Sequence, residues 1–413
     1  MENLFKEIPE SLIAQYVEVR DGETFVIKFG GELFEKEEKL DRFIQSIIFL
    51  VKHKINVILV HGSGPQTSKI VGNEVRDGQR ITPPKKMPEI QAVCAKLSEK
   101  VALILAEYTP VIISPKRFKS DQRDTNNSTA DITDIDPLLQ KDTNILIAGN
   151  IGIDNKTGKY TNINADNIAG TIALSVDNVS KVFFIGKTNG ILADDKITTI
   201  PEIEPESIDS QKYKDGMCPK IEIAKTIAQA GIPVHLVSWN YPGDIVRDSF
   251  IPTGIPERAT MISKLKNPEE FVTLKKDNLL LTQLQTLLSL NPLILPRTKD
   301  ELLQNIENWI ILLQDRVIKG TCEIKKHASN SEIYELGAFA VPCFLHNKGL
   351  GKKIFEQFEL KRKEEGILKG CAIIKSENKK AFSFFSKNGK QKPFPSWFPK
   401  ERKKEERIYF EWE

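Results

Sequence analysis

"TFVIKFGGELF", residues 24–34, begins with an apolar run that stops at two adjacent glycines. β-Branched and aromatic residues dominate the run, so it predicts a buried β-strand ending at Gly30. Further strand-like runs follow: "NVILVHGSG" (56–64), "NILIAGNIG" (144–152), "KVFFIGKTNG" (181–190) and "PVHLVSW" (233–239). Helical apolar spacing separates them, as in residues 38–54 and 164–176. This alternation predicts an α/β fold with a mostly parallel sheet sandwiched by helices.

The chain changes character after Ile262. "SKLKNPEEF" (263–271) is charged and contains a proline, which is typical of a domain boundary. Helix-like segments follow it, and then the strand-like runs "WIILLQ" (309–314) and "IYELGAFAV" (333–341). We therefore expect two domains, residues 1–265 and 270–413, the second a smaller α+β domain. Within the first, the polar stretch 116–134 is expected to be irregular.

Composition excludes several classes of protein. The chain has 413 residues, 40% hydrophobic and 28% charged, which is typical of a globular protein. The net charge of +3 indicates no nucleic-acid partner, and the basic runs near the C-terminus are expected to be solvated surface. Five scattered cysteines predict neither a disulfide framework nor a zinc site. The N-terminus does not read as a signal peptide and no apolar run is long enough for a membrane, so we expect a cytoplasmic protein without a membrane partner.

Two glycine-containing loops follow predicted strands. Gly30 and Gly31 come directly after the strand that carries Lys28, and Gly62 and Gly64 follow the next one. Glycines let backbone N–H groups approach an anion, and a lysine adds charge. A purely structural turn explains each loop about as well when it is taken alone. Together they favour a phosphate or carboxylate site, which in α/β folds lies at the carboxyl ends of the strands.

Other polar residues could complete such a site. Arg80 in "GQRIT" could clamp a carboxylate, and Lys220 lies near a predicted helix start, where the dipole also favours an anion. Asn162 ends an extended segment and could bind a polar ligand. Asp166 opens a helix and could hold two lysines at a phosphoryl-transfer centre. The alternatives are exposed side chains for Arg80 and Lys220 and a helix cap for Asp166.

Five motifs, "IKFGGELF", "VHGSGPQ", "GQRIT", "GNIGID…YTNINAD" and "DGMCPKI", resemble the amino-acid kinase family in their order, over residues 17–262. They are most similar to N-acetylglutamate kinases, which implies phosphorylation of N-acetylglutamate by MgATP. By this resemblance Lys28 and Lys220 neutralise the transferred phosphoryl group and Asp166 organises both lysines. Two departures are Ser63, at a position where glycine is common, and "GKTNG" (186–190) in place of T-D-V-x-G.

The resemblance also implies binding roles. It assigns backbone N–H donation to the glycines of both loops: Gly30 and Gly31 to the nucleotide phosphates, and Gly62 and Gly64 to the substrate. Arg80 and Asn162 are implied to hold the acetylated amino acid. No metal site is expected from the protein's own residues.

The second domain carries a strand, a loop with Gly349 and Gly351, and then a helix, an arrangement that can bind a pyrophosphate. With "NKKAFSFFSKNGK" (378–390) it resembles the GCN5-related acetyltransferases (GNAT), which implies acetyl-CoA bound at Lys348, Gly349 and Gly351. His346 departs from the Gln or Arg usual there. An ordinary β–α turn is the alternative.

Glu335 in "IYELGAFAV" matches the catalytic glutamate of bacterial N-acetylglutamate synthases, which implies a base for the substrate ammonium; a surface carboxylate is the alternative. Candidates for the acid that protonates the thiolate are Ser376 and Ser383, although a structural serine is expected at each. Asn378, Phe384 and Phe385 could line the pantetheine or substrate region, with core packing as the alternative for both phenylalanines.

A kinase-like domain followed by an acetyltransferase domain resembles the N-acetylglutamate synthases of arginine biosynthesis. Retention of the kinase residues favours a bifunctional enzyme that uses acetyl-CoA, glutamate and MgATP. The alternatives are a kinase with a degenerate acetyltransferase domain and a non-catalytic sensor of arginine or an acyl-amino acid. The N-terminal segment "IPESLIAQYVEV" (8–19) is predicted to be an amphipathic helix and resembles the one that joins arginine-sensitive relatives into hexamers, so we expect a homo-oligomer and a possible arginine effector. A helix packed on its own domain explains this segment equally well.

Overall fold

The computed structural model divides the chain into two compact units, unit 1 (residues 1–264) and unit 2 (residues 265–413). The residues whose structure is described are 22–72, 75–76, 79–80, 82–114, 118–120, 130–131, 145–193, 198–200, 202–213, 217–241, 245–246, 259–264, 269–289, 291, 293–314, 317–327, 329–341, 349–399 and 406–413. The N-terminal segment expected to be a helix lies outside them.

The main sheet of unit 1 has eight strands, in the order β14-β16-β15-β11-β1-β2-β8-β5. Their bounds are β14 Glu202–Ile203, β16 Ala259–Ile262, β15 Val234–Ser238, β11 Val179–Gly186, β1 Thr24–Phe29, β2 Asn56–His61, β8 Ile145–Ala148 and β5 Val111–Ile113. All neighbouring pairs are parallel except β15 with β16. The prediction of a mostly parallel sheet is confirmed.

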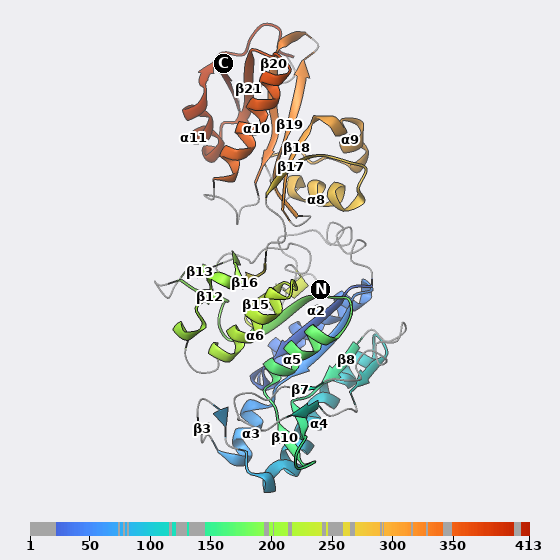
Figure 1. Cartoon of the computed structure of the whole chain (residues 1–413). Coiled ribbons are helices and arrows are strands. Elements are labelled where there is room, and N and C mark those ends of the chain that lie inside the picture. The colour runs from blue at the N-terminus through green and yellow to red at the C-terminus, as the bar shows by residue number, and fades with distance from the viewer. Residues whose placement is uncertain are drawn as a thin grey trace. The chain divides into compact units, whose positions relative to one another are not determined.

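Helices cover both faces of this sheet (Figure 1). Helices α2 (Glu37–Lys52) and α4 (Met87–Ala106) pack on the face that carries Phe25 and Ile27, and α5 (Ala165–Ser175) and α6 (Met217–Gln229) pack on the face of Val26. Every residue of β1 is buried, because a central parallel strand has a helix layer on each side. Smaller elements are α3 Gly64–Val71, β3 Val75–Arg76, β4 Gln79–Arg80, β12 Ile191–Leu192 and β13 Thr199–Ile200.

The polar stretch 116–134 contains two short strands, so the expectation of an irregular segment is wrong for these residues. β6 (Phe118–Ser120) pairs in parallel with β9 (Ile151–Asp154), and β7 (Ala130–Asp131) pairs with β6. β10 (Tyr160–Asn162) completes this four-stranded sheet. A side chain at Gly152 would collide with the carbonyl oxygen of Phe118, so the glycine permits β6 to approach. Pairing between backbone groups forms these strands, and the spacing of apolar residues in the sequence does not reveal such pairing.

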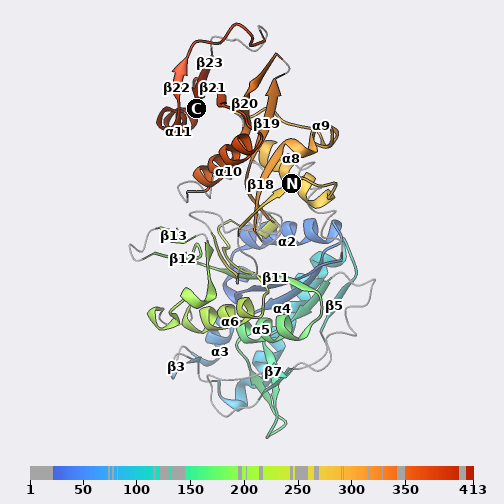
Figure 2. The same ribbon diagram turned by 45° about the horizontal axis from the view of Figure 1, so that its top comes forward.

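Unit 2 is built on a seven-stranded sheet in the order β17-β18-β19-β20-β21-β23-β22. The bounds are β17 Glu270–Thr273, β18 Trp309–Gln314, β19 Val317–His327, β20 Asn330–Ala340, β21 Lys369–Lys375, β23 Arg407–Trp412 and β22 Lys390–Lys392. Figure 2 shows α10 (Leu350–Glu364) along this sheet. α10 and α11 (Lys379–Asn388) pack on one face, and α8 (Asn278–Ser289) and α9 (Lys299–Gln304) pack on the other.

Strands β20 and β21 form a parallel pair in an otherwise antiparallel set of described strands. Their pairing runs from Ile333 to Glu335. β20 then bulges, because three residue steps from Gly337 to Ala340 face two steps on β19, and Ala338 takes a left-handed φ of 43°. The strand that carries Glu335 therefore stays regular from that residue as far as Gly337 and is distorted between Gly337 and Ala340.

No helix among the described residues is long and apolar enough to cross a membrane.

Candidate functional site

The two glycine loops of unit 1 lie against each other at the carboxyl ends of β1 and β2. The backbone N–H of Gly62 donates to the carbonyl of Phe29 (3.0 Å), and the side chain of Gln66 donates to the carbonyl of Gly31 (2.9 Å). A Cβ built on Gly31 would lie 2.9 Å from the backbone nitrogen of Gly64. Glycine at position 31 is therefore required by the close approach of the second loop.

Lys28 and Asp166 form a buried ion pair behind these loops. The Lys28 Nζ lies 2.7 Å from the Asp166 Oδ1, and the two residues are 8% and 5% exposed. Lys220, at the start of α6, brings a second ammonium group to the end of β11, where its Nζ lies 3.3 Å from a Cβ built on Gly186. The three residues named for phosphoryl transfer thus converge at one edge of the sheet.

The charges of these groups act on one another. Burial alone would raise the pKa of Asp166, but the ammonium groups of Lys28 and Lys220 outweigh it and hold the pKa below its ordinary value. Burial lowers the pKa of Lys220, and the charge of Lys28 adds to that decrease while Asp166 opposes it. The exposed Glu32 carboxylate also acts on Lys220 and raises its pKa. The two ammonium groups are the cationic side chains of this group that could attract an anion.

The asparagines before α5 have separate tasks. Asn164 caps the helix, because its Oδ1 accepts from the backbone N–H of Asp166 (2.9 Å). The capping alternative considered for Asp166 therefore belongs to Asn164, and the Asp166 carboxylate is free to pair with Lys28. Asn162 lies at the end of β10, where its Oδ1 accepts from the Nδ2 of Asn150 (2.6 Å).

The remaining predicted residues of unit 1 are placed in part. Arg80 lies in β4, which pairs with β3, and its side chain is outside the described part of the structure. "GKTNG" is the turn that follows β11. Gly190 in it has a φ of 81°, and a Cβ there would lie 2.4 Å from the Thr260 Oγ1. This departure from the family pattern therefore keeps a glycine where the backbone needs one.

Glu335 of unit 2 is buried between two basic side chains. It is 2% exposed, its Oε2 lies 3.1 Å from the Nε2 of His327, and its Oε1 lies 3.6 Å from the Nζ of Lys325. The His327 ring contacts the rings of Trp397 and Phe398 at centroid distances of 5.1 and 5.6 Å. Burial beside β21 and contact with two basic groups do not fit the surface-carboxylate alternative.

The expected acetyl-CoA loop is described at its helical end. Gly349 is the N-cap of α10, with a left-handed φ of 77°, and Gly351 lies in the first turn. The free N–H groups of the first turn of a helix suit a pyrophosphate, so this end of α10 fits the cosubstrate. Lys348 and His346 lie outside the described residues.

Other side chains proposed for the acetyl-transfer site lie in the core, at a helix end or at exposed positions. Phe385 is buried in the core between α10 and the sheet, Phe384 packs against that core, and the Oδ1 of Asn378 caps α11 at Ala381 (3.0 Å). Ser376 and Ser383 are both exposed. These positions favour packing and capping roles for the first three and leave the general acid unassigned.

Sequence reasoning missed some residues that the structure joins to the candidate sites. Asn150 follows β8 at the same sheet edge as Gly62, so the rule that located the glycine loops could have found it. Lys325 and His327 lie on β19 beside Glu335, and their contact depends on strand register. Among the described residues, no His, Cys, Asp or Glu side chains are grouped as a metal site requires.

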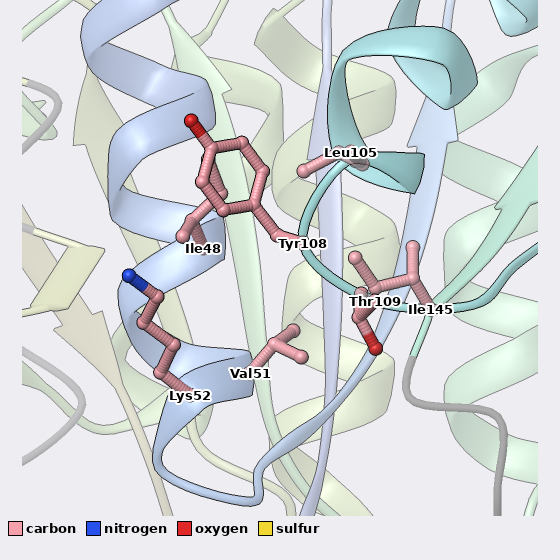
Figure 3. A pocket seen from close by; sticks show the side chains of 7 residues that line it. All are labelled: Ile48, Val51, Lys52, Leu105, Tyr108, Thr109 and Ile145. Carbon is pink, nitrogen blue, oxygen red and sulfur yellow. The ribbon is translucent and has the colours of Figure 1, made fainter.

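A small pocket of about 90 Å³ lies apart from these residues (Figure 3). It is lined by the ends of α2 and α4 and by Ile145, the first residue of β8. Figure 3 shows the side chains of Lys52 and Tyr108 at its rim, where the ammonium lies 5.6 Å from the ring centroid. The pocket is at the amino end of β8, whereas the glycine loops follow the carboxyl ends of their strands.

Comparisons with known proteins agree with this geometry. A sequence model described as "Amino acid kinase family" matches residues 23–238. The acetylglutamate kinase of Pseudothermotoga lettingae is 28% identical over 266 residues, which are 59% of this chain and 94% of that enzyme. The acetylglutamate kinase of Vesicomyosocius okutanii is 29% identical over 286 residues, covering 61% of this chain and 91% of the relative.

Two solved structures of one enzyme each resemble nearly the whole chain. N-acetylglutamate synthase from Neisseria gonorrhoeae, complexed with coenzyme A and L-arginine, covers 97% of both chains with a TM-score of 0.62 and 16% identity. The same enzyme with coenzyme A and N-acetyl-glutamate gives a TM-score of 0.53 at 18% identity and covers 99% of this chain and 98% of that one. This likeness confirms the predicted fold class, including the acetyltransferase-type second sheet.

Proposed function

The chain belongs to the amino acid kinase family, and on that premise we propose that it is a bifunctional enzyme of N-acetylglutamate metabolism. Unit 2 makes N-acetylglutamate from glutamate and acetyl-CoA, and unit 1 phosphorylates the product with MgATP. The observation that carries the kinase half is the buried Lys28–Asp166 pair with Lys220 beside it. The resemblance to acetylglutamate kinases and to a synthase that binds coenzyme A supports the choice of substrates.

In unit 1 the reaction needs positioning and positive charge more than covalent help. A side-chain carboxylate oxygen of N-acetylglutamate forms a bond to the γ-phosphorus as the bond to the bridging oxygen breaks, which releases ADP. Lys28 and Lys220 stabilise the negative charge on the transferred group, and Asp166 holds the lysines in place. The glycine loops supply N–H donors, with Gly30 and Gly31 on the nucleotide side and Gly62 and Gly64 on the substrate side. Arg80 and Asn162 hold the acetylated amino acid.

In unit 2 the amine of glutamate must lose a proton before it attacks the thioester. Glu335 takes that proton, the C–N bond forms and the C–S bond breaks. The nitrogen then loses a second proton, which neutralises the departing thiolate of coenzyme A. Lys348, Gly349 and Gly351 hold the cosubstrate at the start of α10, where acetyl-CoA brings the activated acyl group. The burial of Glu335 supports this role, because a site that excludes water prevents leakage of the transferred proton.

Two further functions compete with this proposal. His346 in the cofactor loop favours a kinase whose acetyltransferase domain is degenerate. The arginine bound to the gonococcal synthase favours an additional sensory role, with arginine as effector.

A paired assay on the purified full chain separates these functions. In the first assay the protein receives acetyl-CoA and glutamate, and the release of free thiol is measured. In the second it receives MgATP and N-acetylglutamate, and any acyl phosphate is trapped with hydroxylamine. We expect both products. Acyl phosphate without thiol release would leave a kinase alone, whereas arginine-dependent melting without either product would leave a sensor.

We further propose that the enzyme is a cytoplasmic homo-oligomer. Among the described residues, Cys94, Cys218 and Cys322 are not in disulfides, which suits a reducing compartment. Sedimentation of the full chain against a chain that lacks residues 1–21 tests assembly. A monomer in both cases would refute the oligomer.

A further inference from the structure

A chain of hydrogen bonds runs behind the substrate side of unit 1. The hydroxyl groups of Thr67 and Ser63 are 3.0 Å apart, and Ser63 donates to the Oδ1 of Asn150 at 3.0 Å. The Nδ2 of Asn150 donates to the Oδ1 of Asn162 at 2.6 Å. The thiol of Cys94 lies 3.4 Å from the same Asn150 oxygen. The chain joins α3, the second glycine loop and β10.

The amide of Asn150, with its oxygen toward Ser63 and its nitrogen toward Asn162, gives the chain a direction. A serine hydroxyl has one proton, so Ser63, which donates to Asn150, must accept from Thr67. The Asn150 oxygen accepts and its Nδ2 donates, so the Asn162 oxygen is the acceptor at the next link. The Nδ2 of Asn162 is therefore the group that Asn162 can offer to a ligand, as a hydrogen-bond donor.

Burial makes this direction costly to reverse. Ser63 and Thr67 are 0% exposed, and Asn150 is 6% exposed. A buried polar group that loses its partner costs about 1–3 kcal/mol, so each link constrains the next. Ser63 has a φ of −126°, which an L-residue adopts without strain. The backbone at this position therefore does not require glycine, and the serine hydroxyl there links Thr67 to Asn150 by hydrogen bonds.

We propose that Ser63 and Asn150 are positioning residues that hold Asn162 with its N–H group toward an acceptor oxygen of the substrate. This inference rests on the proposed kinase function. The ligand it favours is an acylated amino acid, which presents an amide carbonyl oxygen. A free amino acid has an ammonium group in place of the amide and lacks that carbonyl oxygen, so it cannot accept this hydrogen bond there. Ser63 and Asn150 thus contribute to selection of the acylated substrate without touching it.

The test reverses the chain by the change Asn150→Asp. A carboxylate cannot donate, so the amide of Asn162 turns to donate toward residue 150 and presents its oxygen to the ligand. We expect the Kd for N-acetylglutamate, measured by calorimetry on the full chain, to rise at least about tenfold. The KM should rise in parallel while kcat changes little, because the lysines and Asp166 are untouched.

Two serine variants keep the test decisive if Asn150→Asp does not fold. Ser63→Gly removes the hydroxyl donor and should weaken binding about threefold to tenfold, whereas Ser63→Thr retains the hydroxyl and should restore wild-type affinity. Ser68→Ala on the same helix is the matched control and should bind as the wild type does.

The outcomes separate the inference from the function on which it rests. If Asn162→Ala loses binding while Asn150→Asp and Ser63→Gly bind normally, the positioning role is wrong and the kinase stands. If Ser63→Gly and Ser63→Thr lose affinity equally, the hydroxyl is not the cause and the inference fails. If the wild type neither binds nor phosphorylates N-acetylglutamate, the proposed function fails first.

Discussion

The two units surround a buried carboxylate in different ways. In unit 1, Asp166 faces two ammonium groups, those of Lys28 and Lys220. In unit 2, Glu335 lies between Lys325 and His327, and Lys325 also approaches the Glu323 carboxylate at 3.7 Å. The first arrangement places two ammonium groups where they could stabilise a transferred phosphoryl group. The second arrangement has a basic side chain near each oxygen of the carboxylate, which suits a carboxylate that must be held still while it accepts a proton.

The difference indicates a distinct role for each buried carboxylate. Asp166 stays ionised because its neighbours hold its pKa low, so it serves as a fixed negative charge that orders two lysines. Glu335 has a histidine on one oxygen and a lysine near the other, so both oxygens are oriented. Substitutions that affect one reaction and spare the other therefore test whether the two sites are separate.

The largest effect is expected from Lys28→Ala. Loss of one ammonium group leaves Asp166 buried beside Lys220 alone and removes charge from the phosphoryl-transfer site. We expect kcat for acyl phosphate formation to fall about 10²–10³-fold or more, with thiol release from acetyl-CoA unchanged. Lys212→Ala, an exposed lysine of the same unit, is the control. A parallel loss of both reactions would contradict separate sites.

Glu335→Gln should have the next largest effect. The amide has nearly the same shape but cannot accept the ammonium proton, so acetyl transfer should fall about 10²-fold. Acyl phosphate formation in unit 1 should not change. The matched change Glu332→Gln lies on the same strand at an exposed position. Normal thiol release by Glu335→Gln would remove Glu335 as the base.

A smaller effect is expected from Gly31→Ala. The new methyl group would lie 2.9 Å from the Gly64 nitrogen and 3.0 Å from the Gly62 oxygen, which forces the glycine loops apart. Such overpacking costs about 1–3 kcal/mol of folding free energy, so Gly31→Ala should lower the melting temperature, and we expect its kinase kcat/KM to fall about tenfold. A methyl group on Gly62 meets nothing closer than 3.7 Å, so Gly62→Ala should lower the melting temperature less than Gly31→Ala does. Equal shifts in the two variants would show that loop contact does not decide stability.

The smallest expected effect concerns alkaline pH. The pKa of Lys220 lies below the ordinary lysine value because of burial and the nearby Lys28, so its charge is lost earlier as pH rises. The kinase kcat/KM should therefore decline at a pH below about 10.4, the usual lysine pKa. Lys220→Arg, whose charge persists, should move that decline upward. An unchanged alkaline limb in this variant would assign the titration to another group.

Much of this architecture could be predicted from local pattern. Continuous apolar runs that stop at glycines predicted the parallel sheet, and the strand ends predicted where Lys28, Gly31 and Gly62 would gather. The two short strands within residues 116–134 were missed, since their pairing involves backbone groups of polar residues. The bulge at Ala338 was missed for the same reason, because register has no signature in composition.

By itself, then, the sequence determined the fold class, the order of the two units and the residue types available for anion binding, since these follow from apolar periodicity and from glycines after strands. Only the tertiary structure decided which groups pair. Asp166 contacts Lys28 and Glu335 contacts His327, and the side-chain oxygen of Asn162 accepts a hydrogen bond from Asn150. These pairings depend on strand register, on burial and on the number of hydrogen-bond donors and acceptors at each site. All three are decided only when folding brings residues far apart in the chain into contact.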